Sequence, residues 1–436
     1  MNKCAGARYI KLPISRIVNF TRAIVLPGER VSILKARKCI YAMRPIFRYP
    51  APYFITGAAL AAILLGGCTP FAKKPLVDQA QVKQFADRGY DSGIDYETTT
   101  TRLAPDAGNM AFHATVIQPV PEGKYPLVIY LPGLGESADA AANMRGAWAK
   151  SGYVVLSLQP LENDANVWSS DAARSRDYTF LRHEMYSSGI VSERLDILSG
   201  LLVYLKQQAA SNGPDVRHMD LSRIAIAGFD IGAYSAMLVA GEAPQNISFA
   251  GLPLRVGGVI ALSPYADFTG SDFDVRYQKI NMPVLSVTSD TDSDMRGSVP
   301  PSLHQAPFRY MPPGNKYLLV LAGASHAVIG NEDPTKPASH GSDSPQSESG
   351  GSDGDSDSGG SNRHRKKSSG GQSGAASASV RGSSGSPTRR AMLEVASEQV
   401  STAFLNAYIK NDRYSQSWLK NDAQSWLKKT GQLEEK

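Results

Sequence analysis

An aspartate between two glycines marks the point where a predicted strand gives way to a predicted helix. The segment reads Gly228-Phe-Asp230-Ile-Gly232; a strand-like run, residues 223–227, precedes it, and an Ala-rich helical pattern follows to residue 240. The glycines provide the steric clearance that a tight strand-turn-helix elbow needs. The spacing therefore predicts Asp230 as the side chain presented for nucleophilic attack. A literal Gly-x-Ser-x-Gly match at 350–354 has no strand or helix pattern around it, so we discard it.

Two later predicted strands are also followed by side chains that could take part in catalysis. Asp290 and Asp292 come directly after the apolar run 284–288, and His326 follows the run 317–321. The chain order is nucleophile, acid, histidine, in which the histidine moves protons and the acid orients it. From the sequence alone, either Asp290 or Asp292 could be the acid.

The loop after the first predicted core strand, residues 127–131, could supply backbone donors. It reads Leu131-Pro-Gly133-Leu134-Gly135-Glu136. We expect the N–H groups of Leu134 and Ile231 to form an oxyanion hole, that is, a pair of donors for a negatively charged oxygen. Glu136 is interpreted as a solvated turn carboxylate. The other histidines with no such context are interpreted as surface or pocket-lining residues: His183, His218 and His304.

Short apolar runs alternate with helical patterns from residue 127 onward, which favours a mostly parallel, twisted sheet with helices on both faces. Residues 96–103 and 111–118 precede this region and read as an opening hairpin. The stretch 159–190 lacks clear periodicity and is rich in aromatic residues. It could cover a substrate or be merely structural. The stripe over residues 191–208 predicts a helix packed on the sheet.

From about residue 96 to 409, the chain resembles the dienelactone-hydrolase and platelet-activating-factor-acetylhydrolase branch of the α/β-hydrolase superfamily. The resemblance lies in the loop that follows residues 127–131, in the elbow, and in Gly323-Ala-Ser-His-Ala327. It implies an α/β-hydrolase fold, Asp230 as nucleophile, His326 as base and Asp292 as acid, with Asp290 as the alternative acid. It implies no metal and no organic cofactor. These relatives carry serine where this chain has Asp230.

That departure changes the chemistry that the site could perform. A carboxylate is already ionised near neutral pH and needs no base before it attacks. Attack on an ester carbonyl would give an anhydride, whereas attack on an sp³ carbon would give an alkyl ester that His326 could hydrolyse. Haloalkane dehalogenases and epoxide hydrolases of the superfamily work in this way. In these enzymes the leaving group is stabilised by a tryptophan directly after the nucleophile or by tyrosines of a lid. Ile231 excludes the first device here. The candidates for the second are Trp168, Tyr178 and Tyr186.

We therefore expect a hydrolase of a small ester, lactone, epoxide or halide. The alternative is a non-catalytic binding or structural protein on the same scaffold, since a fold does not imply a function. The sequence predicts neither the exact substrate nor the oligomeric state.

The leader predicts export and lipid anchoring. The apolar run 53–67 follows Arg44 and Arg48 and is too short to span a bilayer. Together with the next residue, its end reads Leu65-Gly66-Gly67-Cys68, which resembles a bacterial lipobox with Cys68 as the lipidated residue. The long segment before Met43 suggests that translation begins there. Because Thr69 rather than Asp follows the cysteine, we expect the outer membrane of a bacterial cell envelope, facing the periplasm.

Charge and composition complete the expected organisation. The formal net charge is +6, but residues 1–67 hold eleven basic residues and one acid, which leaves 35 basic against 39 acidic residues and no reason to expect nucleic acid. The expected segments are a leader at 1–67, a tether at 68–92, one domain at 93–332 plus 391–412, a disordered Ser/Gly/Asp-rich insertion at 333–390 and a tail at 413–436.

Overall fold

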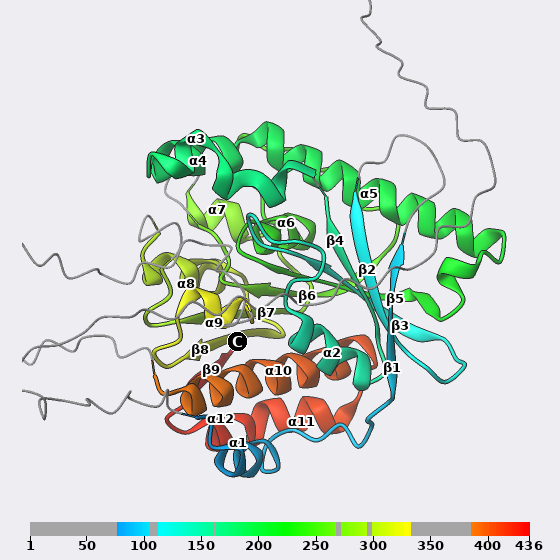
Figure 1. Cartoon of the computed structure of the whole chain (residues 1–436), viewed down its shortest axis with the longest axis vertical. Coiled ribbons are helices and arrows are strands. Elements are labelled where there is room, and N and C mark those ends of the chain that lie inside the picture. The colour runs from blue at the N-terminus through cyan, green and yellow to red at the C-terminus, as the bar shows by residue number, and fades with distance from the viewer. Residues whose placement is uncertain (1–75, 104–111, 161, 267–271, 294–298, 333–384) are drawn as a thin grey trace, which may run out of the picture. The chain divides into compact units, whose positions relative to one another are not determined.

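The computed structural model describes residues 76–103, 112–160, 162–266, 272–293, 299–332 and 385–436. Within these ranges the chain forms one nine-stranded sheet in the order β1-β2-β4-β3-β5-β6-β7-β8-β9 (Figure 1). The strands are β1 (Thr98–Leu103), β2 (His113–Pro119), β3 (Tyr125–Leu131), β4 (Val154–Gln159), β5 (Met219–Phe229), β6 (Val256–Leu262), β7 (Val284–Ser289), β8 (Lys316–Leu321) and β9 (Gly431–Glu435). The expected α/β class is confirmed.

Most of the sheet is parallel. Strands β4, β3, β5, β6, β7 and β8 pair in parallel, whereas β2 is antiparallel to β1 and β4, and β9 is antiparallel to β8. The predicted opening hairpin is confirmed as β1 and β2. All six residues of β4 and all six of β7 are buried, as expected of parallel strands covered on both faces. The carboxyl ends of β3 and β5 to β8 meet at one edge of the sheet.

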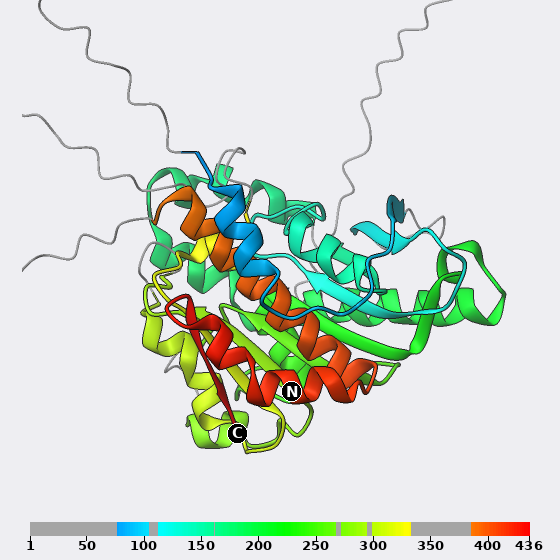
Figure 2. The ribbon, with the colours of Figure 1, turned by 90° about the horizontal axis from the view of Figure 1, so that it is seen from below.

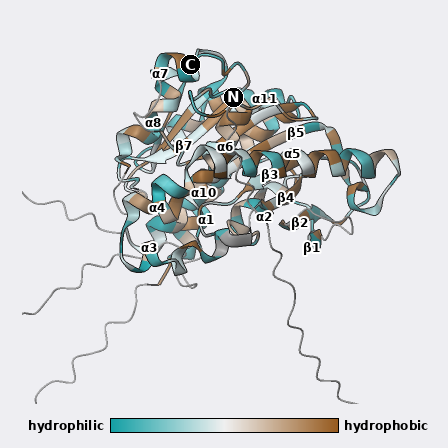
Figure 3. Cartoon of the chain, turned by 90° about the horizontal axis from the view of Figure 1, so that it is seen from above, coloured by the Kyte–Doolittle hydropathy of each residue, from teal (hydrophilic) through white to brown (hydrophobic). Residues whose placement is uncertain are grey.

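Helices cover both faces (Figure 1). One apolar core contains side chains of α2 (Ala142–Lys150), α10 (Pro387–Ile409), α11 (Arg413–Asn421) and α12 (Ala423–Leu427). The other contains side chains of α5 (Ser188–Ala210), α6 (Ile231–Ala240), α7 (Phe273–Tyr277) and α8 (Pro301–Tyr310), and η2 (Pro214–Val216) lies at its margin. Figure 3 shows β5 in brown, whereas α5 alternates between brown and teal, as expected of a helix with one face on a sheet.

The domain is longer than the sequence predicted. Helix α1 (Gln79–Ala86) lies within the expected tether and packs beside α10 (Figure 2). Helix α10 begins at Pro387, inside the expected insertion. The expected tail forms α11, α12 and β9, with the tryptophans Trp418 and Trp426 in the core. Short helices with few apolar residues and a polar edge strand give weak patterns, which is why these elements were missed.

Several predictions concern residues outside the described ranges. These are the leader, the lipobox cysteine Cys68 and the insertion from 333 to 384. Among the described residues, none of the helices combines the length and the apolar character needed to cross a bilayer.

Candidate active site

Asp230 lies at the sharp turn between β5 and α6. Its backbone has φ 53° and ψ −116°, a conformation that side-chain-bearing residues rarely adopt and that is concentrated at functional sites. A Cβ added to Gly228 would lie 2.3 Å from the backbone of Gly232, and one added to Gly232 would lie 2.0 Å from the carbonyl oxygen of Leu131. The two glycines are therefore required for the close approach of β5, α6 and the loop after β3, as their spacing predicted.

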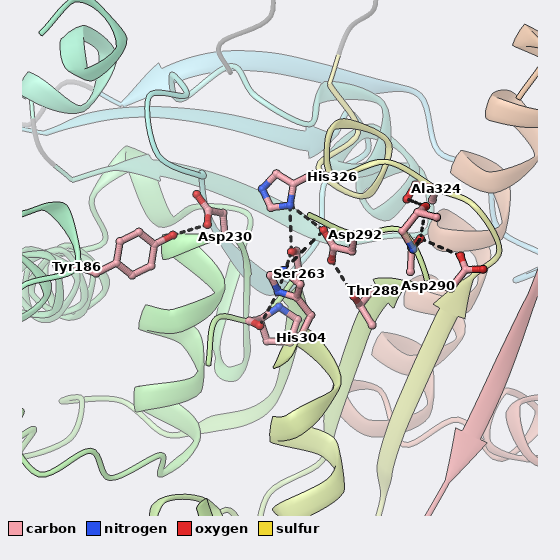
Figure 4. A network of polar contacts seen from close by, with 12 residues as sticks. Tyr186, Asp230, Ser263, Thr288, Asp290, Asp292, His304, Ala324 and His326 are labelled. Atoms are coloured by element: carbon pink, nitrogen blue, oxygen red, sulfur yellow. Dashed lines mark hydrogen bonds and ion pairs between the residues drawn. The ribbon is translucent and has the colours of Figure 1, made fainter. Parts of the chain in front are cut away.

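The Asp230 carboxylate is buried and bonded through both oxygens. The residue is 3% exposed. The backbone N–H of Leu134 donates to Oδ2 at 3.3 Å, and the hydroxyl of Tyr186 donates to Oδ1 (Figure 4). Leu134, the first predicted oxyanion donor, thus contacts Asp230 itself. The second predicted donor, Ile231, is the first residue of α6 and is fully buried.

His326 and Asp292 form the predicted pair. His326 is the first residue of α9 (His326–Ile329), just after β8, and its Nδ1 lies 2.9 Å from Oδ1 of Asp292. The hydroxyl of Thr288 donates to the other Asp292 oxygen at 2.7 Å. Figure 4 shows the imidazole between Asp292 and Asp230, with its second ring nitrogen on the side of Asp230. This arrangement leaves Nε2 of His326 as the nitrogen directed toward Asp230.

Asp292, not Asp290, contacts the histidine. Asp290 instead accepts a hydrogen bond from the backbone N–H of Gly323 at 2.6 Å and so stabilises the loop that carries His326. Burial raises the pKa of Asp292, but the hydrogen bond from His326, the charges of His304 and His326 and the bond from Thr288 together outweigh it, so this pKa lies below its usual value. The acid is therefore held as a carboxylate, which favours a protonated Nδ1 on His326.

Two residues that sequence reasoning missed complete this group. Ser263, directly after β6, has φ 51° and places its Oγ 3.1 Å from Nδ1 of His326 and 3.3 Å from Nδ1 of His304. His304 Nδ1 donates to the carbonyl of Pro264 at 3.1 Å, and its Nε2 lies 4.0 Å from Asp292 Oδ1. Ser263 could have been found from its place after a strand between the elbow strand and the acid strand, whereas no pattern marks His304.

The prediction for His304 was therefore only partly right. Its side chain is 1% exposed and lies against Asp292, and burial lowers its pKa. The other two histidines fit their interpretation better, because His183 is exposed and His218 is half-buried. Among the described residues, no group of three or more His, Cys, Asp or Glu side chains is arranged to hold a metal ion.

The interpretation of Glu136 as a solvated carboxylate was wrong. The residue is 5% exposed, and its Oε2 accepts a hydrogen bond from the N–H of Gly133 at 2.7 Å. Burial raises the pKa of Glu136 to about 8; the Gly133 bond opposes this shift, and the charges of Glu332 and Asp230 add to it. Glu136 thus keeps its proton at neutral pH and adds no second negative charge next to the Asp230 carboxylate.

Ionisation of Glu136 should make the protein less stable as the pH rises. The folded chain holds the proton up to about pH 8 and the unfolded chain loses it near 4.5, so the stability present below pH 4.5 falls progressively as the pH rises toward 8. We expect Glu136→Gln, which cannot ionise, to gain on the order of 3 kcal/mol relative to wild type over this interval. Urea unfolding at several pH values measures this, with the exposed Glu122→Gln as control; parallel curves for wild type and Glu136→Gln would contradict it.

The aromatic stretch 159–190 contacts Asp230 and the loop after β3. It forms η1 (Glu162–Ser169), α3 (Asp171–Arg174) and α4 (Tyr178–Met185). Asp164 of η1 makes a buried ion pair with Arg194 of α5 at 2.6 Å, and Trp168 donates to the carbonyl of Leu134 at 3.2 Å. Tyr186 follows α4 and reaches Asp230. Of the three aromatic candidates for assisting a leaving group, Tyr186 is the one that contacts Asp230. Trp168 contacts the loop after β3, and Tyr178 packs against an apolar cluster.

Tyr186 is held by other aromatic rings. Its ring centroid lies 4.3 Å from that of Tyr265 and 6.2 Å from that of Tyr234. These tyrosines belong to an apolar cluster with residues of the oxyanion loop, α5 and α6. The surroundings of Asp230 on this side are therefore largely apolar, which suits a small substrate of low polarity.

Comparison with known proteins gives no relative from which a role could be transferred. No protein-family model matches the chain, and no curated protein matches it. What the site can do chemically follows from its geometry: a carboxylate at a strained turn, an amide on one of its oxygens, a tyrosine hydroxyl on the other, and a histidine paired with a buried acid beside it.

Proposed function

We propose that this protein is an α/β-hydrolase-fold enzyme that uses Asp230 to attack an sp³ carbon of a small apolar electrophile such as an epoxide or a haloalkane. The observation that carries the proposal is the pair of bonds on Asp230, from the Leu134 N–H to one oxygen and from the Tyr186 hydroxyl to the other. The order of nucleophile, acid and histidine after β5, β7 and β8 supports the fold and the dienelactone-hydrolase-like branch.

In the first step, Oδ1 of Asp230 forms a bond to the substrate carbon, and the bond from that carbon to the leaving group breaks. An epoxide oxygen leaves as an alkoxide and takes the proton of the Tyr186 hydroxyl, which lies on Oδ1 before substrate enters. Water then returns a proton to Tyr186. A halide leaves as an anion and needs no proton. The product of this step is an alkyl ester on Asp230, whose carbonyl oxygen, Oδ2, stays on the N–H of Leu134.

In the second step, water attacks the ester carbon of Asp230. Nε2 of His326 takes the water proton, and Asp292 stabilises the resulting imidazolium through Nδ1. The negative charge that develops on Oδ2 is stabilised by the Leu134 N–H. Collapse of this intermediate releases the alcohol, to which His326 returns the proton, and leaves Asp230 as a carboxylic acid with one oxygen taken from water. Loss of the second water proton to solvent restores the carboxylate. With an epoxide this proton offsets the one that water gave to Tyr186, and with a haloalkane it accompanies the halide.

The label of that oxygen tests the proposal. The protein is incubated in ¹⁸O-water with panels of epoxides, haloalkanes and esters, at a protein concentration above that of the substrate. Peptides of the protein are then analysed by mass spectrometry. We expect ¹⁸O in the Asp230 peptide after one turnover and none in the first product, since the product oxygen comes from the carboxylate. Samples without substrate control for exchange. Label in the product and none at Asp230 would exclude the covalent cycle.

Tyr186→Phe should separate the substrate classes. Without the hydroxyl, an epoxide oxygen would leave unprotonated, so we expect kcat on an epoxide to fall about 10²-fold with little change in KM. A haloalkane needs no such proton and should keep its rate. Steady-state kinetics measures both, with Tyr310→Phe, an exposed tyrosine of α8, as control. Equal losses on both substrates would argue that Tyr186 only positions Asp230.

A second candidate function has one observation in its favour. Asp230 is 3% exposed and both of its oxygens are bonded, as expected if aspartate replaced serine in a chain that lost activity. The protein would then be a binding or structural lipoprotein on the same scaffold. No turnover and no label on any panel, with His326→Ala indistinguishable from wild type, would favour this function.

We further propose that the protein is a lipid-anchored component of a bacterial cell envelope, at the outer membrane and facing the periplasm. The support is the apolar run that ends in Leu65-Gly66-Gly67-Cys68. In a bacterial host, Cys68→Ala should move the protein from the membrane fraction to the soluble fraction, as immunoblotting of fractions shows. Retention of the variant in the membrane would contradict the anchor.

A further inference from the structure

The loop that carries Leu134 is closed by a single side chain. The N–H of Gly133 donates to Glu136 Oε2 at 2.7 Å, and the N–H of Glu136 donates back to the carbonyl of Gly133 at 3.1 Å. The two bonds fix both polar groups of Gly133 on one residue. The next amide along the chain, that of Leu134, is then directed at Asp230 Oδ2.

We propose that Glu136 is a positioning residue, whose neutral side chain closes the turn that aims the Leu134 N–H at Asp230. The inference depends on the proposed function for its catalytic meaning, because Leu134 is the donor for the ester oxygen. Its structural content, the coupling of the Glu136 side chain to the Leu134 amide, holds for either candidate function.

The neutral form of Glu136 follows from its surroundings. The titratable groups that face it are Tyr130, Arg145, Glu332, Asp230 and His326. Arg145 interacts with Glu136 only through its charge, because its guanidinium donates to the carbonyl of Ala140 at 2.7 Å and to the hydroxyl of Thr115 at 3.1 Å. The pKa of Glu136, raised by burial to about 8, agrees with a protonated side chain at neutral pH.

A charged side chain at this position would affect the site. A Glu136 carboxylate would repel Asp230 and stabilise a proton on His326, which must be free of a proton at Nε2 to act as base. A neutral acid accepts the Gly133 N–H bond through its carbonyl oxygen without either effect. Glutamine has the same acceptor and no charge, so Glu136→Gln should preserve the turn, and Glu136→Ala should release it.

Hydrogen exchange of the Leu134 amide tests the coupling without requiring activity. Wild type, Glu136→Gln and Glu136→Ala are compared by NMR at each of several pH values from 6 to 10, so that the intrinsic pH dependence of exchange cancels. We expect at least tenfold faster exchange of Leu134 in the alanine variant and wild-type exchange in the glutamine variant. Above about pH 8, wild type should exchange faster than the glutamine variant. The amide of Val128, inside β3, controls for general unfolding.

Turnover provides the second readout. With a substrate from the panels, kcat of Glu136→Ala should fall about tenfold to a hundredfold, which is less than the loss caused by removing a whole oxyanion donor. Glu136→Gln should have the wild-type kcat. It should also lack the fall in rate that wild type shows above about pH 8. Unchanged Leu134 exchange in the alanine variant, or a glutamine variant that behaves like alanine, would overturn the positioning role. If wild type turns over no substrate, the proposed function fails, and the exchange result still decides the role of Glu136.

Discussion

Asp230→Asn should reduce turnover by about 10⁴-fold or more, the range seen when a nucleophile is removed from a hydrolase. The carboxamide cannot attack carbon, and its NH₂ group cannot accept the one bond, from Leu134 or from Tyr186, that the oxygen it replaces accepts. The rate is measured on whichever panel substrate wild type consumes, and circular dichroism checks the fold.

The matched control for this variant is Asp171→Asn, a carboxylate that is exposed at the start of α3. It should keep the wild-type rate. Intact mass must show that the asparagine has not deamidated to aspartate. Residual activity of Asp230→Asn above a few per cent, at the correct mass, would mean that another group performs the attack.

His326→Gln should stop the reaction after its first step. In the proposed cycle Asp230 attacks without help from a base, whereas hydrolysis of the ester needs the Nε2 of His326. We therefore expect the alkyl ester to accumulate to one per chain. Multiple turnover should fall by about 10²-fold to 10⁴-fold. Intact mass and peptide mapping measure the adduct and place it on the Asp230 peptide.

The double variant Asp230→Asn with His326→Gln is the control for the adduct. It should remain unmodified under the same conditions. Loss of turnover in His326→Gln without an adduct would place the histidine in the first step and argue against a nucleophile that needs no base. An adduct on the double variant would show that the label is not specific for Asp230.

The elements that could be predicted from sequence are those whose patterns follow from local physics. Buried parallel strands need continuous apolar runs, so the core strands were found, and the elbow was found because its glycines are needed for close backbone approach. Parallel strands bring their carboxyl ends to one edge, which placed His326 near Asp292 before any distance was known.

The residues that were missed depend on contacts between distant parts of the chain. Ser263 reaches His326 from the end of β6, and His304 reaches Asp292 from a helix whose pattern shows only its apolar residues. Tyr186 was one of three aromatic candidates, but nothing in a stretch without periodicity singled it out as the residue that reaches Asp230. Glu136 looked solvated because loop acids usually are, and only the packing around it shows otherwise. The choice between Asp290 and Asp292 likewise needed the direction of each side chain, which spacing does not give.

Strand β9 covers the edge of the sheet beside the strand that leads to His326. It pairs with β8, and the N–H of Ala322 beyond β8 donates to the carbonyl of Thr430 just before β9 at 2.9 Å. Without β9, β8 would have one row of unsatisfied backbone groups, which is a template for pairing with other chains. Deletion of residues 431–435 would therefore leave a chain that retains Asp230 and His326 and is prone to aggregate.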